Sequence, residues 1–261
     1  MKAKSNGIEL NYEIHGSKGP WVVLSHSLAC DLHMWEAQID LLKDRFRVLA
    51  YDTRGHGRSD APSGAYTMDQ LVEDVRGLLS GVGADRPHWV GLSMGGMIGM
   101  TYALKYPGEF QSLVLCDTSS RIPPEMAPVW AERIKAATEQ GMSALVAPTL
   151  ERWFTEPFRQ SRKDVMDHVA DMITNTPVSG YAGCCHAIPT INCTDQLHAI
   201  KSPVQIIVGE QDAGTPVAMS EAIHSAIAGS ELVIIPQASH LSNLEQPAKF
   251  NEALMRFLSA H

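Results

Sequence analysis

The sequence lacks the features that would place the protein on a nucleic acid, in a membrane or in an oxidising compartment. It carries 21 Lys and Arg against 29 Asp and Glu, and a net charge of −8 argues against a nucleic-acid or anionic-membrane surface. No apolar segment typical of a secretion signal follows the first residues, and the longest apolar run, near residues 97–104, is too short to span a bilayer. The five cysteines include no C-x-x-C pair, which argues against a zinc site, and their odd number suggests reduced thiols. We therefore expect a cytoplasmic protein without a metal, as a monomer or small homo-oligomer.

The sequence also contains no internal repeat, low-complexity tract or charged tail. Short apolar runs predict buried strands, and these runs lie at residues 21–25, 46–51, 88–90, 113–117, 204–208 and 232–235. Amphipathic stretches between the runs predict helices, one of which starts with a capping box formed by Thr67 and Gln70. Alternating strands and helices predict an α/β fold, with a mostly parallel central sheet and helices on both faces. An Asn6-Gly7 pair before an alternating run predicts an N-terminal antiparallel strand or hairpin.

Between residues 120 and 189 the strand-like runs disappear. Helical stretches rich in Met and Trp replace them, and prolines at 123, 124, 128, 148 and 157 divide these stretches into short pieces. The segment follows a predicted strand, so it could cover the carboxyl edge of the sheet, where α/β folds place their sites. We therefore predict a core of residues 1–119 and 190–261 and a helical cap of residues 120–189.

Gly91-Leu92-Ser93-Met94-Gly95 matches the pattern G-x-S-x-G, and its flanks make the match informative. A predicted strand precedes the motif and a predicted helix follows it, which is the context of a nucleophile elbow. The sharp turn forces the serine into an unfavourable backbone geometry, and the two glycines leave room for the helix to pass close to the strand. We predict that Ser93 is a catalytic nucleophile; the alternative is an ordinary turn serine.

A serine nucleophile needs a general base and an acid that orients it, and after such an elbow the acid precedes the histidine in the chain. His240 follows the last predicted strand and is our candidate base, whereas the other late histidines lie in helical patterns or at the end of the chain. Asp212 follows the strand at 204–208 and is our candidate acid. Glu210 is a near rival, and Asp117 is a more remote one.

The oxyanion of an acyl-transfer intermediate needs two preorganised donors. Met94, directly after the nucleophile, and Leu28, in the loop after the strand at 21–25, are expected to supply their backbone N–H groups. Aromatic residues of the cap could line a substrate pocket or pack inside the cap; they are Trp130, Trp153, Phe154 and Tyr181. Three cap arginines could bind a substrate carboxylate or form ordinary ion pairs; they are Arg121, Arg133 and Arg152. Of these, Arg121 is included among the candidate pocket residues.

The whole chain resembles the α/β-hydrolase superfamily, and within it the 3-oxoadipate enol-lactone hydrolases. The resemblance rests on four segments: Ser25–Trp35, Arg47–Ser59, Gly91–Gly96 and Arg152–Thr155. The chain departs from that family's usual pattern near the expected pocket, where His26 replaces Asn, Ala29 replaces Gly, and a Cys184-Cys185 pair replaces a single cysteine.

The resemblance implies an α/β-hydrolase fold and a serine hydrolase that cleaves a small carboxylic ester or lactone without a cofactor. Alternatives among such enzymes are an N-acyl-homoserine lactone lactonase and a broad short-chain carboxylesterase. A remote alternative is a ligand receptor on the same fold that does not turn its ligand over.

Overall fold

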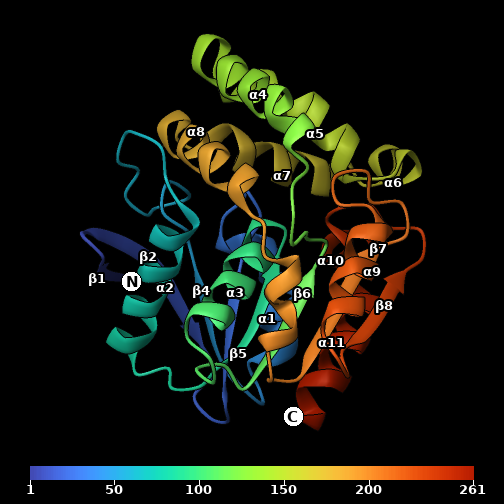
Figure 1. The fold of residues 1–261 in the computed structure, drawn as a ribbon. Coiled ribbons are helices and arrows are strands. Elements are labelled where there is room, and N and C mark those ends of the chain that lie inside the picture. The colour runs from blue at the N-terminus through green and yellow to red at the C-terminus, as the bar shows by residue number, and fades with distance from the viewer.

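The computed structural model describes all 261 residues and contains one eight-stranded sheet in the order β1-β2-β4-β3-β5-β6-β7-β8 (Figure 1). The strands are β1 (Lys2–Ser5), β2 (Ile8–His15), β3 (Trp21–Ser25), β4 (Arg47–Tyr51), β5 (His88–Leu92), β6 (Ser112–Cys116), β7 (Val204–Gly209) and β8 (Glu231–Ile235). β1 pairs with β2 and β2 with β4 in antiparallel register, and all other pairs are parallel. The predicted fold class is confirmed, and the apolar runs coincide with strands, of which β3 to β7 are largely buried. The run at 232–235 differs, because β8 is the edge strand of the sheet and only its last residue, Ile235, is buried.

The helices of the sheet region begin and end where their local sequence dictates. α2 (Met68–Val82) starts at the predicted capping box, in which Thr67 Oγ1 accepts from Gln70 N and the Gln70 side chain accepts from Thr67 N. It ends at Gly83, whose φ of 70° is easily adopted by glycine. The remaining helices of this region are α1 (Glu36–Leu42), α3 (Met94–Lys105), α9 (Val217–Ala226), α10 (Ser242–Glu245) and α11 (Pro247–Ala260). α1 packs with α11 and α2 packs with α3, so helices cover both faces of the sheet.

Only helices and short 3₁₀ turns lie between β6 and β7. They are α4 (Ala127–Gln140), α5 (Val146–Trp153), α6 (Glu156–Ser161), α7 (Lys163–Asn175) and α8 (Val178–Ala187), with 3₁₀ turns at 124–126, 142–145, 188–190 and 194–199. Figure 1 shows α4 to α8 as a layer at one end of the sheet. This arrangement is compatible with the predicted cap, whose division from the core at residues 119 and 190 stays a prediction.

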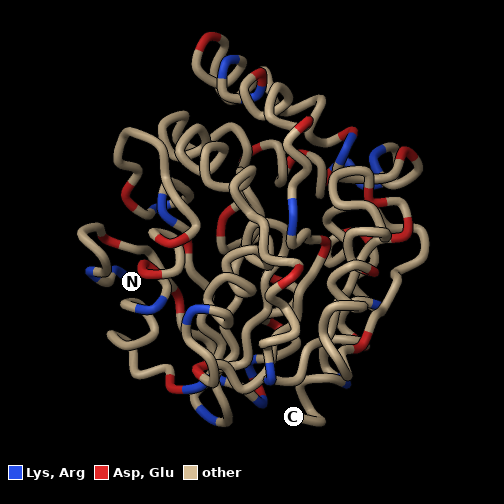
Figure 2. The backbone as a smooth tube through the Cα atoms, in the orientation of Figure 1, with Lys and Arg blue, Asp and Glu red and all other residues tan.

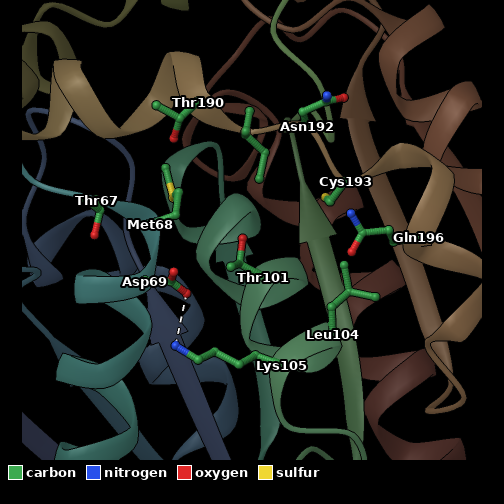
Figure 3. Close-up of a pocket in the computed structure, with 11 residues that line it drawn as sticks. Thr67, Met68, Asp69, Thr101, Leu104, Lys105, Thr190, Asn192, Cys193 and Gln196 are labelled. Atoms are coloured by element: carbon green, nitrogen blue, oxygen red, sulfur yellow. Dashed lines mark hydrogen bonds and ion pairs between the residues drawn. The ribbon is translucent and has the colours of Figure 1, made fainter.

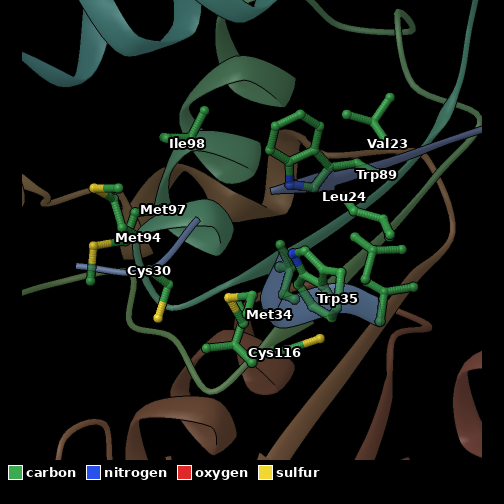
Figure 4. Close-up of a cluster of buried hydrophobic side chains, with 14 of the residues drawn as sticks. Val23, Leu24, Cys30, Met34, Trp35, Trp89, Met94, Met97, Ile98 and Cys116 are labelled. Atoms are coloured by element: carbon green, nitrogen blue, oxygen red, sulfur yellow. The ribbon is translucent and has the colours of Figure 1, made fainter. Parts of the chain in front are cut away.

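One continuous hydrophobic cluster connects the sheet region to the helices above it. Below the turn at Ser93 the cluster is rich in sulfur, because Cys30, Met34, Met94 and Cys116 are all fully buried there (Figure 4). Thioether side chains adapt to irregular spaces, which suits the packing beneath a strained turn.

Charged residues of both signs are distributed over the molecule rather than gathered in one large patch (Figure 2). None of the helices combines the length and the apolar character that a membrane span requires.

Candidate active site

Ser93 occupies the turn between β5 and α3 and has a backbone φ of 54°, which is unusual for a residue with a side chain. Two close contacts hold the backbone in this geometry. A Cβ atom on Gly91 would lie 2.3 Å from the carbonyl oxygen of Gly95, and one on Gly95 would lie 2.2 Å from that of Ser25. The Ser93 hydroxyl does not cap α3, although serine commonly does so at this position. It lines a cavity instead, so the hydroxyl is available to a ligand.

His240 and Asp212 are in direct contact, because His240 Nδ1 lies 2.8 Å from Asp212 Oδ2. The other carboxylate oxygen of Asp212 accepts from Gly214 N at 2.7 Å and Thr215 N at 2.9 Å. Burial raises the pKa of Asp212, but the charge and hydrogen bond of His240, with the bonds from Thr215, outweigh burial and lower it. An ionised Asp212 fixes the proton on Nδ1, which leaves His240 Nε2 as the proton acceptor. His240 lines the same cavity as Ser93.

The two rival acids are engaged elsewhere. Asp117 accepts from Gly209 N at 2.8 Å and from Ser242 Oγ at 2.6 Å, and burial together with the charge of Asp212 raises the pKa of Asp117 well above its ordinary value. Glu210 is exposed and accepts from Gln237 N at 3.1 Å. Neither carboxylate is hydrogen-bonded to His240, so the geometry favours Asp212 as its partner.

In the loop after β3, Leu28 N is a backbone donor without a protein acceptor, between residues whose N–H groups are bonded. The neighbouring N–H groups are all hydrogen-bonded: Ser27 N to Met34 Sδ at 3.3 Å, Ala29 N to His56 Nε2 at 3.0 Å and Cys30 N to Ser27 O at 3.2 Å. Leu28 N donates to no protein group, and Leu28 lines the cavity. Met94 is the first residue of α3, so its N–H has no acceptor within the helix. These are the two donors that the sequence predicts for an oxyanion.

The cavity has a volume of about 270 Å³ and is lined by residues of both the sheet region and the helical layer. Of the predicted pocket residues, it contains Trp130 on α4 and Trp153 on α5. Apolar lining residues that the sequence did not single out are Met97, Ile122, Met126, Ile188 and Met219. They belong to separate segments without a common periodicity, so no local pattern could have found them.

Three predicted pocket residues lie outside the lining, and each has another role. Phe154 is buried and stacks on Phe158 with ring centroids 5.5 Å apart, and Tyr181 is buried within the helical layer on α8. Arg121 Nη2 binds Asp195 Oδ2 at 2.7 Å, and Arg121 Nε donates to an asparagine side chain. That exposed ion pair holds the guanidinium outside the cavity.

Arg133 and Arg152 do line the cavity, and neither forms an ion pair with a carboxylate of the protein. The Arg133 guanidinium lies 4.5 Å from the ring centroid of Trp130. Burial and the nearby charge of Arg133 lower the pKa of Arg152 to about 10. Two guanidinium groups without protein counter-ions make this part of the cavity attractive to an anion.

A larger hollow of about 520 Å³ lies between α2, α3 and residues 190–196 (Figure 3). In it Lys105 is paired with Asp69, and burial raises the pKa of Cys193 to about 11, which makes that thiol a poor nucleophile at neutral pH. The hollow contains no nucleophile with an adjacent base, so the cavity at Ser93 is the candidate active site.

Comparison with known proteins shows similarity to hydrolases over the whole chain. The family model described as the alpha/beta hydrolase fold matches residues 20–247. The chain is 35% identical to 3-oxoadipate enol-lactonase 2 of Acinetobacter baylyi, over 95% of this chain and 92% of that protein. It is similar to the crystal structure of the enol-lactonase from Burkholderia xenovorans LB400, with a TM-score of 0.95 and 39% identity over 99% of this chain and 100% of that one. A malate-bound thermophilic esterase from Thermogutta terrifontis gives a TM-score of 0.94 and 31% identity, over 100% of this chain and 98% of that one.

Proposed function

The chain belongs to the α/β-hydrolase fold family, and from this membership we propose that it is a hydrolase of carboxylic esters, and of lactones in particular, with Ser93 as its nucleophile. The similarity to enol-lactonases over the whole chain supports the reaction class. The observation that carries the assignment of residues is that Ser93 and the Asp212–His240 pair meet at one cavity.

The proposed mechanism assigns one role to each of these groups. His240 Nε2 removes the proton as Ser93 Oγ attacks the carbonyl carbon, and ionised Asp212 stabilises the resulting imidazolium. The N–H groups of Leu28 and Met94 bind the oxyanion of the tetrahedral intermediate. When the ring of a lactone opens, the leaving oxygen takes the proton from His240 and remains part of the acyl group. Water activated by His240 then hydrolyses the acyl-enzyme.

The substrate class that the cavity favours is a lactone or ester that also carries a carboxylate. Arg133 and Arg152 supply guanidinium groups without protein counter-ions, and Trp130 and Trp153 supply apolar surface for the rest of a small molecule. The names of the similar proteins support this proposal, because they include an enol-lactonase of 3-oxoadipate and an esterase with malate bound. All five cysteines are buried free thiols, which supports the proposal of a cytoplasmic enzyme, as a monomer or small homo-oligomer.

Replacing Ser93 with Ala tests the proposed nucleophile. We expect the wild type to be labelled by a fluorophosphonate and to hydrolyse an enol-lactone with multiple turnovers, because the reagent and the substrate react with the same activated hydroxyl. Ser93→Ala should lose both properties and keep its melting temperature, and Ser143→Ala, at an exposed serine on the helical layer, should keep both. Undiminished labelling of Ser93→Ala would place the reactive serine elsewhere.

A substrate panel tests the reaction class. We expect kcat/KM to be highest for an enol-lactone bearing a carboxylate, lower for acyl-homoserine lactones and lowest for p-nitrophenyl acetate. The reverse order would favour a broad esterase, and a single slow turnover would favour a receptor.

A further inference from the structure

Glu245 is a buried carboxylate close to the candidate base, and it has no cationic partner. It is 4% exposed and lies at the end of α10, five residues after His240. Its oxygens accept three hydrogen bonds: from Ser239 N at 2.8 Å, from Thr155 N at 3.1 Å and from Thr155 Oγ1. A buried carboxylate needs several hydrogen-bond donors to replace the water that it loses on burial. Glu245 therefore depends on two segments that are far apart in the chain.

The segment Arg152–Thr155 contacts the histidine loop on both sides of His240. On one side, Ser239 Oγ lies 3.2 Å from Arg152 O. On the same side, Glu245 accepts hydrogen bonds from both Ser239 N and Thr155 N and so connects the two segments. On the other side, Leu241 N donates to Trp153 O at 3.3 Å. The Trp153 ring also lies beside the imidazole of His240, with ring centroids 6.0 Å apart. The backbone at the base is thus held by the helical layer as well as by the sheet region.

The same short segment presents Arg152 and Trp153 to the cavity. Substrate contacts and support for the base are therefore made by adjacent residues of one segment. We propose that Glu245 is a positioning residue for His240, which couples the cap segment Arg152–Thr155 to the base through Thr155 and Ser239. This inference rests on the proposed function, because it assumes that His240 is the general base.

The inference predicts which kinetic constant changes. Glu245→Gln keeps the size of the side chain but replaces one carboxylate oxygen with an NH₂ donor, and Ser239 N and Thr155 bond to different oxygens, so one of the two connections is lost. Arg152 and Trp153 still line the cavity in the variant, so substrate binding is expected to persist. The histidine loop is held less firmly in the variant, so we expect the imidazole of His240 to move relative to Ser93. A displacement of about 1 Å at a catalytic group costs about 100-fold in rate. We therefore expect kcat and the rate of the acylation burst to fall by about 10- to 100-fold with KM nearly unchanged.

The experiment measures burst and steady-state kinetics with p-nitrophenyl acetate, active sites by fluorophosphonate titration, and the melting temperature. Thr155→Val, which removes the hydroxyl donor, should lower kcat in the same direction, and Thr155→Ser should restore it. In the combined Glu245→Gln and Thr155→Val variant, the fold loss in kcat should be smaller than the product of the two single losses. Both substitutions break the same hydrogen-bonded connection from Thr155 through Glu245 to Ser239. Glu252→Gln, at an exposed carboxylate on α11, is the matched control and should leave kcat and KM unchanged.

The outcomes separate this inference from the proposed function. If the wild type is neither labelled at Ser93 nor active, the proposed function fails. If the wild type is active and Glu245→Gln lowers only the melting temperature, with kcat per titrated site unchanged, Glu245 is structural and the inference is overturned. A rise in KM with constant kcat would also overturn it, because Glu245 would then act on substrate binding.

Discussion

Replacing Arg152 with Met should make the protein more stable and less active on acidic substrates. Arg152 lines the cavity and has no carboxylate partner in the protein, so it is a partly buried charge without compensation. Methionine preserves much of the apolar contact area of the side chain and removes the charge. The backbone carbonyl of residue 152, which accepts from Ser239 Oγ, is retained.

The size of the stability change follows from the pKa of Arg152, which burial and the charge of Arg133 lower to about 10. This lowering corresponds to at most about 3 kcal/mol of unfavourable charge burial, and solvent at the partly exposed side chain reduces it to about 1–2 kcal/mol. Because the pKa is lower in the folded state, the cost is present in full at neutral pH and declines only as pH rises above about 10. The variant should therefore melt a few degrees higher at neutral pH.

The size of the activity change follows from the lost contact with a substrate carboxylate. A hydrogen bond to a charged group contributes about 1.5–3 kcal/mol, which corresponds to about 10- to 150-fold in kcat/KM. Arg133 remains in the cavity and compensates in part, so a loss near the lower limit is expected. A substrate without a carboxylate makes no such contact, and its kcat/KM should change little.

The assay compares one enol-lactone acid with the primary carboxamide of the same acid, because the two share the reacting ring and are close in size, and the amide lacks the remote charge without adding a second ester. Lys135→Met is the matched control, since it removes one positive charge from an exposed position on α4 and leaves the cavity unchanged. An equal loss on both substrates in Arg152→Met would refute the reasoning, because Arg152 would then shape the cavity rather than bind a carboxylate. An unchanged kcat/KM for the acid would refute it as well.

Two further predictions concern the elbow and the acid. Asp212→Asn should lower kcat by about 10⁴-fold in turnover assays, because the amide favours the wrong tautomer of His240. The lowered pKa of Asp212 contributes stability above about pH 4 that is lost as pH falls through the folded-state pKa, so the melting temperature should fall less in the variant than in the wild type as pH is lowered below about 4. Gly95→Ala should lower the melting temperature and abolish activity, because its Cβ would lie 2.2 Å from Ser25 O, whereas Gly81→Ala, with open space in α2, should be tolerated. A fully active Gly95→Ala variant would contradict the argument for close packing at the elbow.

The fold is predictable from the sequence because its signals are local. The runs at 21–25 and 204–208 are mostly apolar, as expected for strands covered by helices, and they coincide with β3 and β7, which are buried on both faces. The elbow is equally local, since Gly91 and Gly95 flank Ser93 directly. The order of the parallel strands then brings the loops after β5, β7 and β8 to one edge, which is why Asp212 and His240 could be chosen before their contact was known.

The side-chain partners are not local, and there the sequence was insufficient. Arg121 and Arg152 look equivalent in the sequence, yet Arg121 binds Asp195, 74 positions later, and Arg152 binds no carboxylate. Glu245 stands near His240 in the sequence, but its partner Thr155 lies 90 positions earlier. Such partners are determined by how the helical layer is placed on the sheet. This placement cannot be predicted from the periodicity of any one segment.

The residues proposed to break the bond and most of those proposed to face the substrate come from different parts of the chain. Ser93, Asp212 and His240 lie on loops after β5, β7 and β8, whereas Trp130 and Arg133 lie on α4. No hydrogen bond joins α4 to residues 239–241, whose partners outside the loop are Asp212, Gln211, Thr215, Glu245 and the segment Arg152–Trp153. Changes on α4 should therefore alter which acid is accepted while leaving cleavage of a neutral ester intact. Changes at Thr155 or Glu245 should impair both reactions, because they displace the base that both require.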